Sequence, residues 1–157
     1  MKSSLSSDFA NKFLSTFFYS GYFPFVPGTF ASFIAALLFL SIESFYLRVF
    51  FAVNLLVLGV LISGRVEKLF GKKDPSCIVI DEAAGVFLSL LFVPLDIRYT
   101  SLAFILFRFF DAVKPYPADI IQRYKGSLGI IGDDVIAAIY TNIVFQAVFR
   151  LVSLRAW

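Results

Sequence analysis

Charged side chains recur where apolar stretches of this sequence end. The stretch RFFDAVKPYP follows the apolar run SLAFILF and places Arg108, Asp111 and Lys114 three residues apart, roughly along one face of a helix. The three charges could neutralise one another as a ladder of salt bridges. Alternatively, Asp111 serves a metal or a water while the two cations bind anionic oxygens. Because Pro115 disfavours helical geometry at the preceding residue, we expect Lys114 to project from a helix end, where its point charge can reach a phosphate.

Further carboxylates lie at similar positions. Burying an ionised carboxylate is costly unless it is paired or binds a metal, so acids at the edges of apolar segments are candidates for function. The chain has no histidine and one cysteine, which excludes imidazole-based catalysis and leaves hard oxygen ligands that favour Mg²⁺ over zinc or copper. The candidate acids are Asp74, Asp81, Glu82, Asp111, Asp133 and Asp134.

Each acidic pair also has a structural interpretation. Asp81 and Glu82, adjacent in IVIDEAAG, could complement the dipole at the start of a helix. Asp133 and Asp134, in GIIGDDVIAA, could be the N-cap and first turn of another helix. Capping does not explain why acids recur on one side with basic residues among them. The joint pattern therefore favours a site.

The segment FVPGTFAS, residues 25–32, adds a candidate anion cradle. Pro27 suits the first turn of a helix, Gly28 permits close approach, and Thr29 and Ser32 offer hydroxyl groups. Free backbone N–H groups at a helix start bind anions. The alternative is an ordinary junction between a loop and a helix.

The composition indicates a membrane protein. Hydrophobic residues make up 59% of the 157 residues and charged residues only 16%, whereas soluble domains have about 45–50% and about 25%. The chain is expected to form one domain, residues 1–157, with an all-α fold: a membrane-embedded bundle of about four to five hydrophobic helices and an N-terminal amphipathic helix within residues 7–21. The expected hydrophobic segments are 27–42, 46–63, 80–95, 99–113 and 133–153.

The basic residues predict an orientation. Lys and Arg concentrate in residues 1–26, 64–79 and 114–132, whereas the intervening loops hold only Arg48 and Arg98. Because positive loops tend to stay cytoplasmic, we place these three stretches inside and, with five crossings, the C-terminus outside. The N-terminal stretch lacks the apolar core of a cleavable signal peptide.

Four motifs together resemble the phosphatidylglycerophosphatase A family in order, spacing and content. They are PGTFAS, DPSCIVIDEAAG, RFFDAVKPYPAD and KGSLGIIGDDVIAA, within about residues 20–145. The chain departs from the family pattern at Ala31 and Ala138, both small-for-small changes. The resemblance implies an all-helical, Mg²⁺-dependent phosphatase. Such an enzyme converts phosphatidylglycerophosphate to phosphatidylglycerol at the bacterial inner membrane, and we expect its site on the cytoplasmic side.

The resemblance also implies roles for individual residues. Metal binding and water positioning fall to the acids already named, and phosphate binding to the cations and the PGT segment. Mg²⁺ would polarise the phosphoryl group and activate a water, one carboxylate would act as base, and Lys114 or Arg108 would offset developing charge. Direct attack by water is favoured, and a phospho-aspartate route stays open. The expected metal ligands are Asp81, Glu82, Asp111, Asp133 and Asp134, with Asp74 and Glu67 as additional candidates; the expected phosphate-binding residues are Arg108, Lys114, Thr29 and Gly28.

Two alternatives come from other functional classes. An ion or proton transporter would carry acids near the midpoints of its membrane segments, whereas these acids cluster at segment ends. A structural membrane subunit would use its acids only to cap helices and pair with basic loops. The expected partners are the membrane and a phospholipid substrate in the inner leaflet, with no nucleic acid; the oligomeric state is left open.

Overall fold

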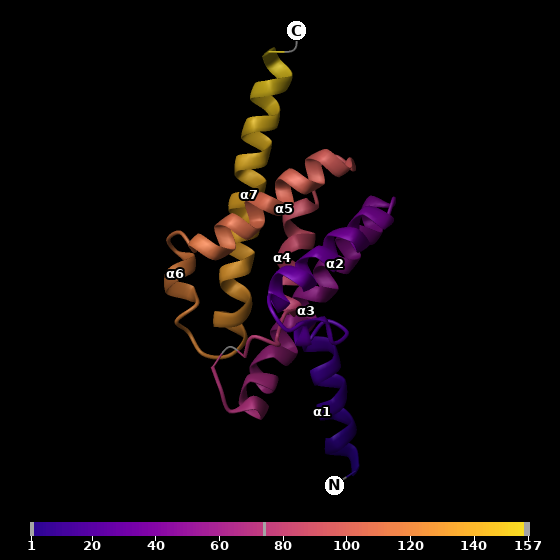
Figure 1. Ribbon diagram of the computed structural model, residues 1–157, viewed down its shortest axis with the longest axis vertical. Coiled ribbons are helices and arrows are strands. Elements are labelled where there is room, and N and C mark those ends of the chain that lie inside the picture. The colour runs from indigo at the N-terminus through magenta and orange to yellow at the C-terminus, as the bar shows by residue number, and fades with distance from the viewer. Residues whose placement is uncertain (1, 74, 156–157) are drawn as a thin grey trace.

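The computed structural model describes residues 2–73 and 75–155, with side chains for residues 8–73 and 75–152. Throughout this part of the chain the secondary structure is helical, without strands, which confirms the all-α prediction (Figure 1). The helices are α1 (Lys2–Ser15), the 3₁₀ turn η1 (Ser20–Tyr22), α2 (Pro27–Ser41), α3 (Phe45–Phe70), α4 (Ile80–Leu90), α5 (Ile97–Val113), α6 (Ala118–Ile121) and α7 (Ser127–Arg155).

Local sequence signals set several helix ends. Pro27 occupies the first turn of α2, where its missing N–H costs no helical hydrogen bond. Asp96 caps α5 by accepting a hydrogen bond from the backbone N–H of Arg98 at 2.8 Å. Gly71 ends α3 in the left-handed conformation, with φ 64°. Lys114 ends α5 in the same region, with φ 47°, directly before Pro115 as expected.

Other boundaries differ from the expected segments. The last helix begins at Ser127, six residues before the expected 133–153 segment. Its early glycines are sites of close packing: a Cβ on Gly129 would lie 2.1 Å from the carbonyl oxygen of Tyr124, and one on Gly132 would lie 2.4 Å from the side chain of Ile121. α4 ends at Leu90, five residues short of the expected 80–95 segment.

The short helix α4 lies among the other helices and contacts α2, α3, α5 and α7. Alanines on the packed faces, including Ala31, Ala35 and Ala83, are fully buried and let the helix backbones approach closely. The space between them is filled by large side chains. The largest buried ones are Phe39, Phe87, Phe107 and Phe145. This packing fixes where α4 begins, and with it the position of the Asp81–Glu82 pair.

Two helices are long and apolar enough to cross a membrane: α3, and α7 over Ser127–Val152. Large apolar side chains are exposed along both, among them Phe50, Leu61 and Ile143, where lipid can cover them. Membrane association therefore agrees with both composition and structure. The number of crossings and the orientation stay predictions.

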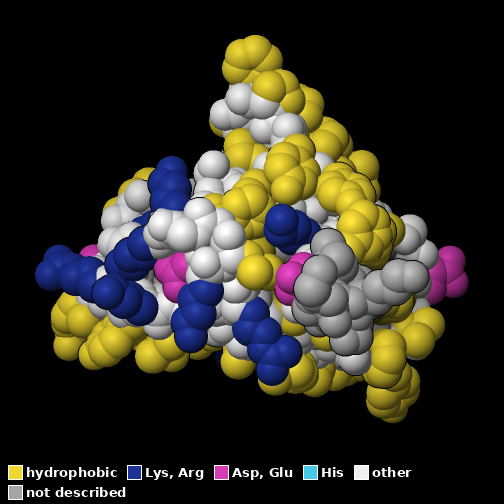
Figure 2. Space-filling model, turned by 90° about the horizontal axis from the view of Figure 1, so that it is seen from below, with side chains coloured by type: hydrophobic (Ala, Val, Ile, Leu, Met, Phe, Trp, Pro, Cys, Tyr) yellow, Lys and Arg dark blue, Asp and Glu magenta, His cyan; other side chains and the backbone are white. Residues whose placement is uncertain are grey.

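Basic side chains gather at one end of the molecule. Figure 2 views the end where α1 and the loop after α3 lie, and Lys and Arg side chains cover part of this face. The loop after α3 and the loop after α6 meet there, since the Lys73 ammonium donates a hydrogen bond to the carbonyl oxygen of Arg123 at 3.1 Å. The exposed cations of this end include Lys68, Lys72, Lys73, Arg123 and Lys125.

Candidate active site

Helix ends from four different parts of the chain enclose one polar pocket of about 330 Å³. α2 and α4 contribute their first turns, α5 its last two turns, and α7 its second and third turns. The pocket thus joins residues more than a hundred positions apart in the sequence. Its lining residues are Val26, Pro27, Gly28, Thr29, Ser76, Ile78, Asp81, Glu82, Arg108, Asp111, Lys114, Ile130, Asp133 and Asp134.

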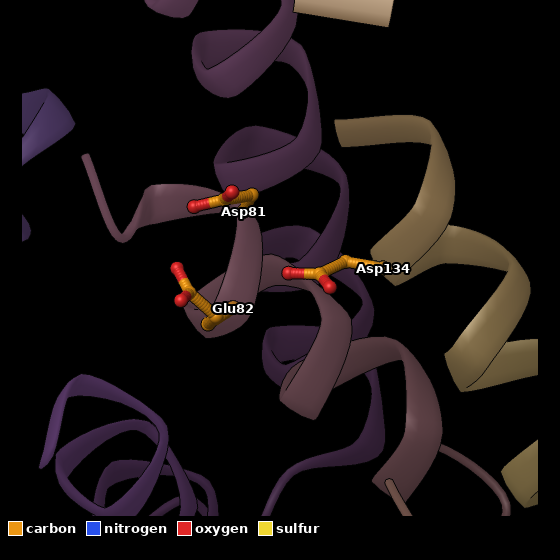
Figure 3. Close-up of side chains that lie close together, drawn as sticks. All are labelled: Asp81, Glu82 and Asp134. Carbon is orange, nitrogen blue, oxygen red and sulfur yellow. The ribbon is translucent and has the colours of Figure 1, made fainter. Parts of the chain in front are cut away.

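Three carboxylates form the core of this pocket. Asp81 and Glu82 come from α4, and Asp134 reaches them from α7 (Figure 3). Each residue offers an oxygen that lies within 4.8 Å of the other two. This spacing allows a single cation to contact all three, so the group could hold a metal ion.

The hydrogen bonding of these acids also fits a cation. One buried oxygen each of Glu82 (Oε2), Asp133 (Oδ1) and Asp134 (Oδ2) has no hydrogen-bond partner within the described part of the chain. Leaving buried carboxylate oxygens without a partner costs several kcal/mol. A divalent cation would offset that cost, and hard oxygen donors suit Mg²⁺. The residues present therefore fit the expected metal.

A ladder of ion pairs runs beside the acids. The Arg108 guanidinium lies 2.7 Å from Asp111, and the Lys114 ammonium lies 3.6 Å from the other oxygen of Asp111. Lys114 also pairs with Asp133 of α7. The salt-bridge interpretation of RFFDAVKPYP is thus confirmed, but the ladder continues into the acidic pocket instead of ending on its own helix.

Lys114 stays charged in this setting. Burial lowers the pKa of its ammonium group, but the hydrogen bond and charge of Asp133, together with the charges of Asp111 and Asp134, outweigh burial and raise the pKa above its ordinary value. A cation next to these three carboxylates can accept an anionic ligand without a change of protonation.

Arg108 is held from a second side by the start of α2. Its guanidinium donates to the hydroxyl oxygen of Thr29 at 3.1 Å and to that of Ser32 at 3.3 Å. The first helical hydrogen bond of α2 runs from the N–H of Phe30 to the carbonyl of Val26, so the N–H groups before Phe30 lie ahead of the helical ladder. The PGT segment and Arg108 thus form one wall with the features of an anion cradle.

Gly28 lines the same wall, where the absence of a side chain admits Glu82. A Cβ at this position would lie 2.0 Å from the Glu82 carboxylate oxygen Oε1. The glycine therefore sets the closest approach between α2 and the acidic group.

A family comparison decides what kind of pocket this is. Residues 13–149 match the model of the phosphatidylglycerophosphatase A family. The chain belongs to the phosphatidylglycerophosphatase A family. It is therefore a phosphatase, and the resemblance noted from the four motifs is confirmed. Neither the transporter nor the purely structural interpretation is supported.

Curated relatives cover most of the chain. A protein of Bacteroides thetaiotaomicron with the provisional name phosphatidylinositol-3-phosphatase is 35% identical over 92% of both chains. The phosphatidylglycerophosphatase A of Haemophilus influenzae is 35% identical over 86% of both chains. That of Escherichia coli is 31% identical over 80% of this chain and 76% of its own. No solved structure matches the chain.

The pocket of this family member contains most of the expected site residues, but not all of them. Asp74 lies outside the described residues. Glu67 is absent from the pocket lining: one of its carboxylate oxygens accepts a hydrogen bond from the backbone N–H of Gly126 at 2.8 Å, in the loop before α7. Its hydrogen bond stabilises that loop, whereas Asp81, Glu82, Asp111, Asp133 and Asp134 line the pocket directly.

The capping interpretation of Asp133 and Asp134 is wrong. α7 begins at Ser127, so both aspartates lie beyond its first turn and turn into the pocket. Asp81 and Glu82 do occupy the first turn of α4, so in their case a favourable interaction with the helix dipole and a place in the pocket coexist. Sequence reasoning did not select Ser76, Ile78 or Ile130 as lining residues, and it carried no signal for them beyond their proximity to motif residues.

The role of Gly28 gives a testable expectation. In Gly28→Ala the new methyl group would displace the Glu82 carboxylate, and a shift of about 1 Å can cost about 100-fold in rate. We expect phosphatase activity to fall by about this factor while the helical content measured by circular dichroism is retained.

Gly59→Ala is the matched control. This glycine of α3 is also tightly packed, but its Cβ would meet the flexible end of Ile131, outside the pocket. It should retain most activity. Equal losses in both variants would mean that helix packing, not the position of Glu82, limits the rate.

Proposed function

We propose that this phosphatase removes the terminal phosphate of phosphatidylglycerophosphate, with Mg²⁺ as cofactor, and leaves phosphatidylglycerol and inorganic phosphate at the cytoplasmic side of the bacterial inner membrane. The observation that carries the proposal is the pocket itself. Acids suited to a divalent cation and cations suited to a phosphate meet there across four helix ends. The names of the two phosphatidylglycerophosphatase relatives support the choice of substrate.

Asp81, Glu82 and Asp134 would hold the metal ion, with Asp111 and Asp133 next to them. When bound, Mg²⁺ supplies Lewis-acid polarisation of a phosphoryl oxygen and lowers the pKa of a coordinated water. The remaining carboxylates can accept a proton from the attacking water. The oxygen of that water forms the new bond to phosphorus while the ester bond to the glycerol oxygen breaks, and that oxygen takes up a proton as it leaves.

Arg108 and Lys114 bind and orient the phosphate. Thr29, Ser32 and Asp111 fix the guanidinium of Arg108, so it can present its remaining donors without losing side-chain freedom on binding. Lys114 projects from the end of α5 and reaches the pocket as a second positive charge. Together they offset the negative charge that accumulates on the transferring phosphoryl group.

The basic face supports the proposed cytoplasmic orientation of the site. The exposed cations near the ends of α3 and α6 lie in the stretches expected on the cytoplasmic side. The motif acids lie on segments that adjoin these stretches, which favours access to substrate in the cytoplasmic leaflet.

A second substrate class has its own support. The relative from B. thetaiotaomicron, similar over most of this chain, has a name that specifies a phosphatidylinositol 3-phosphate. Both candidates are phosphomonoesters on a lipid headgroup, and they differ in the alcohol that leaves. Direct comparison of the two lipids with one preparation of enzyme separates them, and we expect phosphatidylglycerophosphate to be the better substrate.

Removal of the metal should stop the reaction. Purified protein in detergent is expected to release phosphate from phosphatidylglycerophosphate, to lose at least about 100-fold of that rate in excess EDTA, and to recover it with Mg²⁺. The measurement is inorganic phosphate over time. Undiminished phosphate release in EDTA would overturn the metal assignment, and wild-type protein that hydrolyses only phosphatidylinositol 3-phosphate would overturn the choice of substrate.

A further inference from the structure

The connection between α1 and α2 displays a row of exposed apolar side chains beside the active site. Residues 17–26 read FFYSGYFPFV. Phe25 is 85% exposed, and Tyr22, Val26 and Phe23 are also exposed. We refer to Tyr22, Phe23, Phe25 and Val26 as the aromatic ledge. An exposed apolar cluster on this scale indicates a surface that meets lipid or another apolar partner.

The ledge is held in place by its backbone. Three residues in succession, Phe17, Phe18 and Tyr19, have φ values of 43°, 58° and 67°, and they form the turn that follows α1. Gly21 then packs so tightly that a Cβ would lie 2.1 Å from the carbonyl oxygen of Cys77. The ring of Phe23 stacks on that of Phe30 in α2, with centroids 4.3 Å apart. The exposed rings are thus presented by a fixed segment.

The two ends of this segment border two different environments. Val26 lines the catalytic pocket and precedes the PGT turn that faces Arg108. At the other end, Phe17 and Phe18 line a mainly apolar cavity of about 290 Å³ between α2, α3 and α4. A phospholipid needs a charged binding site for its phosphate next to an apolar surface for its acyl chains. The segment of residues 17–26 lies between the charged catalytic pocket and the apolar cavity.

Anchoring alone does not account for the ledge. α3 and α7 are each long and apolar enough to cross the membrane, so attachment does not depend on four side chains in a connecting turn. The location of the ledge next to the phosphate-binding wall is the feature that needs explanation.

We propose that the aromatic ledge binds the acyl chains of the lipid substrate, along more of their length than a hexanoyl chain offers, while the phosphate occupies the catalytic pocket. The proposal rests on the lipid phosphatase function proposed above and adds the surface that recognises the diacylglycerol part. Tyr and Phe suit this role because they combine large apolar area with few rotatable bonds. The ledge should therefore make activity depend on acyl chain length.

The test compares long-chain and short-chain substrate with a ledge variant. Wild-type protein and Phe25→Ser are assayed in the same mixed micelles with dioleoyl and dihexanoyl phosphatidylglycerophosphate. We expect the ratio of kcat/KM for the long-chain over the short-chain lipid to fall about ten-fold in Phe25→Ser, because loss of one buried aromatic contact weakens binding by about this factor. The loss should appear mainly in KM.

Tyr46→Ser is the matched control. Tyr46 is 84% exposed and lies in the first turn of α3, at the end of that helix farther from the pocket. In Tyr46→Ser the ratio of kcat/KM for the long-chain over the short-chain lipid should equal that of the wild type. An unchanged ratio in Phe25→Ser, or the same change in both variants, would overturn the ledge proposal.

The outcomes also separate this proposal from the proposed function. If wild-type protein hydrolyses phosphatidylinositol 3-phosphate and not phosphatidylglycerophosphate, the substrate assignment fails and the same chain-length comparison with the inositol lipid still decides the ledge. If it hydrolyses neither lipid and acts only on soluble phosphate esters, both proposals fail.

Discussion

Asp134→Asn is expected to lower kcat for lipid phosphate hydrolysis about 1,000-fold, equivalent to about 4 kcal/mol of transition-state stabilisation. Asp134 is 3% exposed and brings the only α7 oxygen of the three-carboxylate group. Asparagine keeps the shape of the side chain, but it removes a negative charge and replaces one carboxylate oxygen with an NH2 group, which cannot bind a cation. The variant should therefore fold and bind Mg²⁺ much more weakly.

Phosphate release measured against Mg²⁺ concentration tests this expectation. Asp134→Asn should need far more Mg²⁺ for half-maximal rate. Asp96→Asn is the control, because Asp96 caps α5 away from the pocket and asparagine caps helices equally well. A near-normal rate in Asp134→Asn at ordinary Mg²⁺ would remove Asp134 from the metal site.

Arg108→Lys should lower kcat/KM about 100-fold although it keeps the positive charge. Lysine offers a point charge and cannot reproduce the planar set of donors that reaches Thr29, Ser32 and Asp111 together. The phosphate would lose a fixed partner, and the Asp111 carboxylate would lose its contact with the guanidinium at 2.7 Å. A charge-assisted pair lost at a partly buried site accounts for an effect of this size.

Steady-state kinetics on the lipid substrate checks this second expectation. Arg98→Lys is the matched control, since Arg98 is largely exposed and forms its ion pair with Asp96, outside the pocket. It should change kcat/KM less than about two-fold, as surface ion pairs contribute little. If Arg108→Lys behaves like Arg98→Lys, charge alone suffices and the guanidinium has no specific role in binding phosphate.

Much of this site could be predicted because its signals are local. The spacing of Arg108, Asp111 and Lys114, with Pro115 behind them, indicated a charged helix end, and Lys114 has the non-helical geometry that Pro115 favours. The apolar segments predicted five of the helices to within a few residues, except at the start of α7 and the ends of α3 and α4. Acids at segment ends indicated a shared face, and the pocket joins them.

The features that escaped prediction depend on tertiary contacts. The expected last segment began after Gly129 and Gly132, whereas α7 includes both glycines, and the chain around Ile121 and Tyr124 packs against their bare backbone. The hydrogen bonds from Arg108 to Thr29 and Ser32 span more than seventy positions, and no local pattern specifies them. Glu67 was a candidate ligand on its charge and location alone, whereas the hydrogen bond that it accepts from Gly126 depends on the fold.

The central claim is that carboxylates from α4 and α7 form one metal site next to a phosphate-binding wall. A crystal structure with Mn²⁺ in place of Mg²⁺, collected at the manganese absorption edge, tests this most directly. We expect an anomalous peak among Asp81, Glu82 and Asp134, with Arg108 and Lys114 facing it across the pocket. Protein that is active in the same buffer but shows no peak there, or has its metal bound elsewhere, would contradict the account.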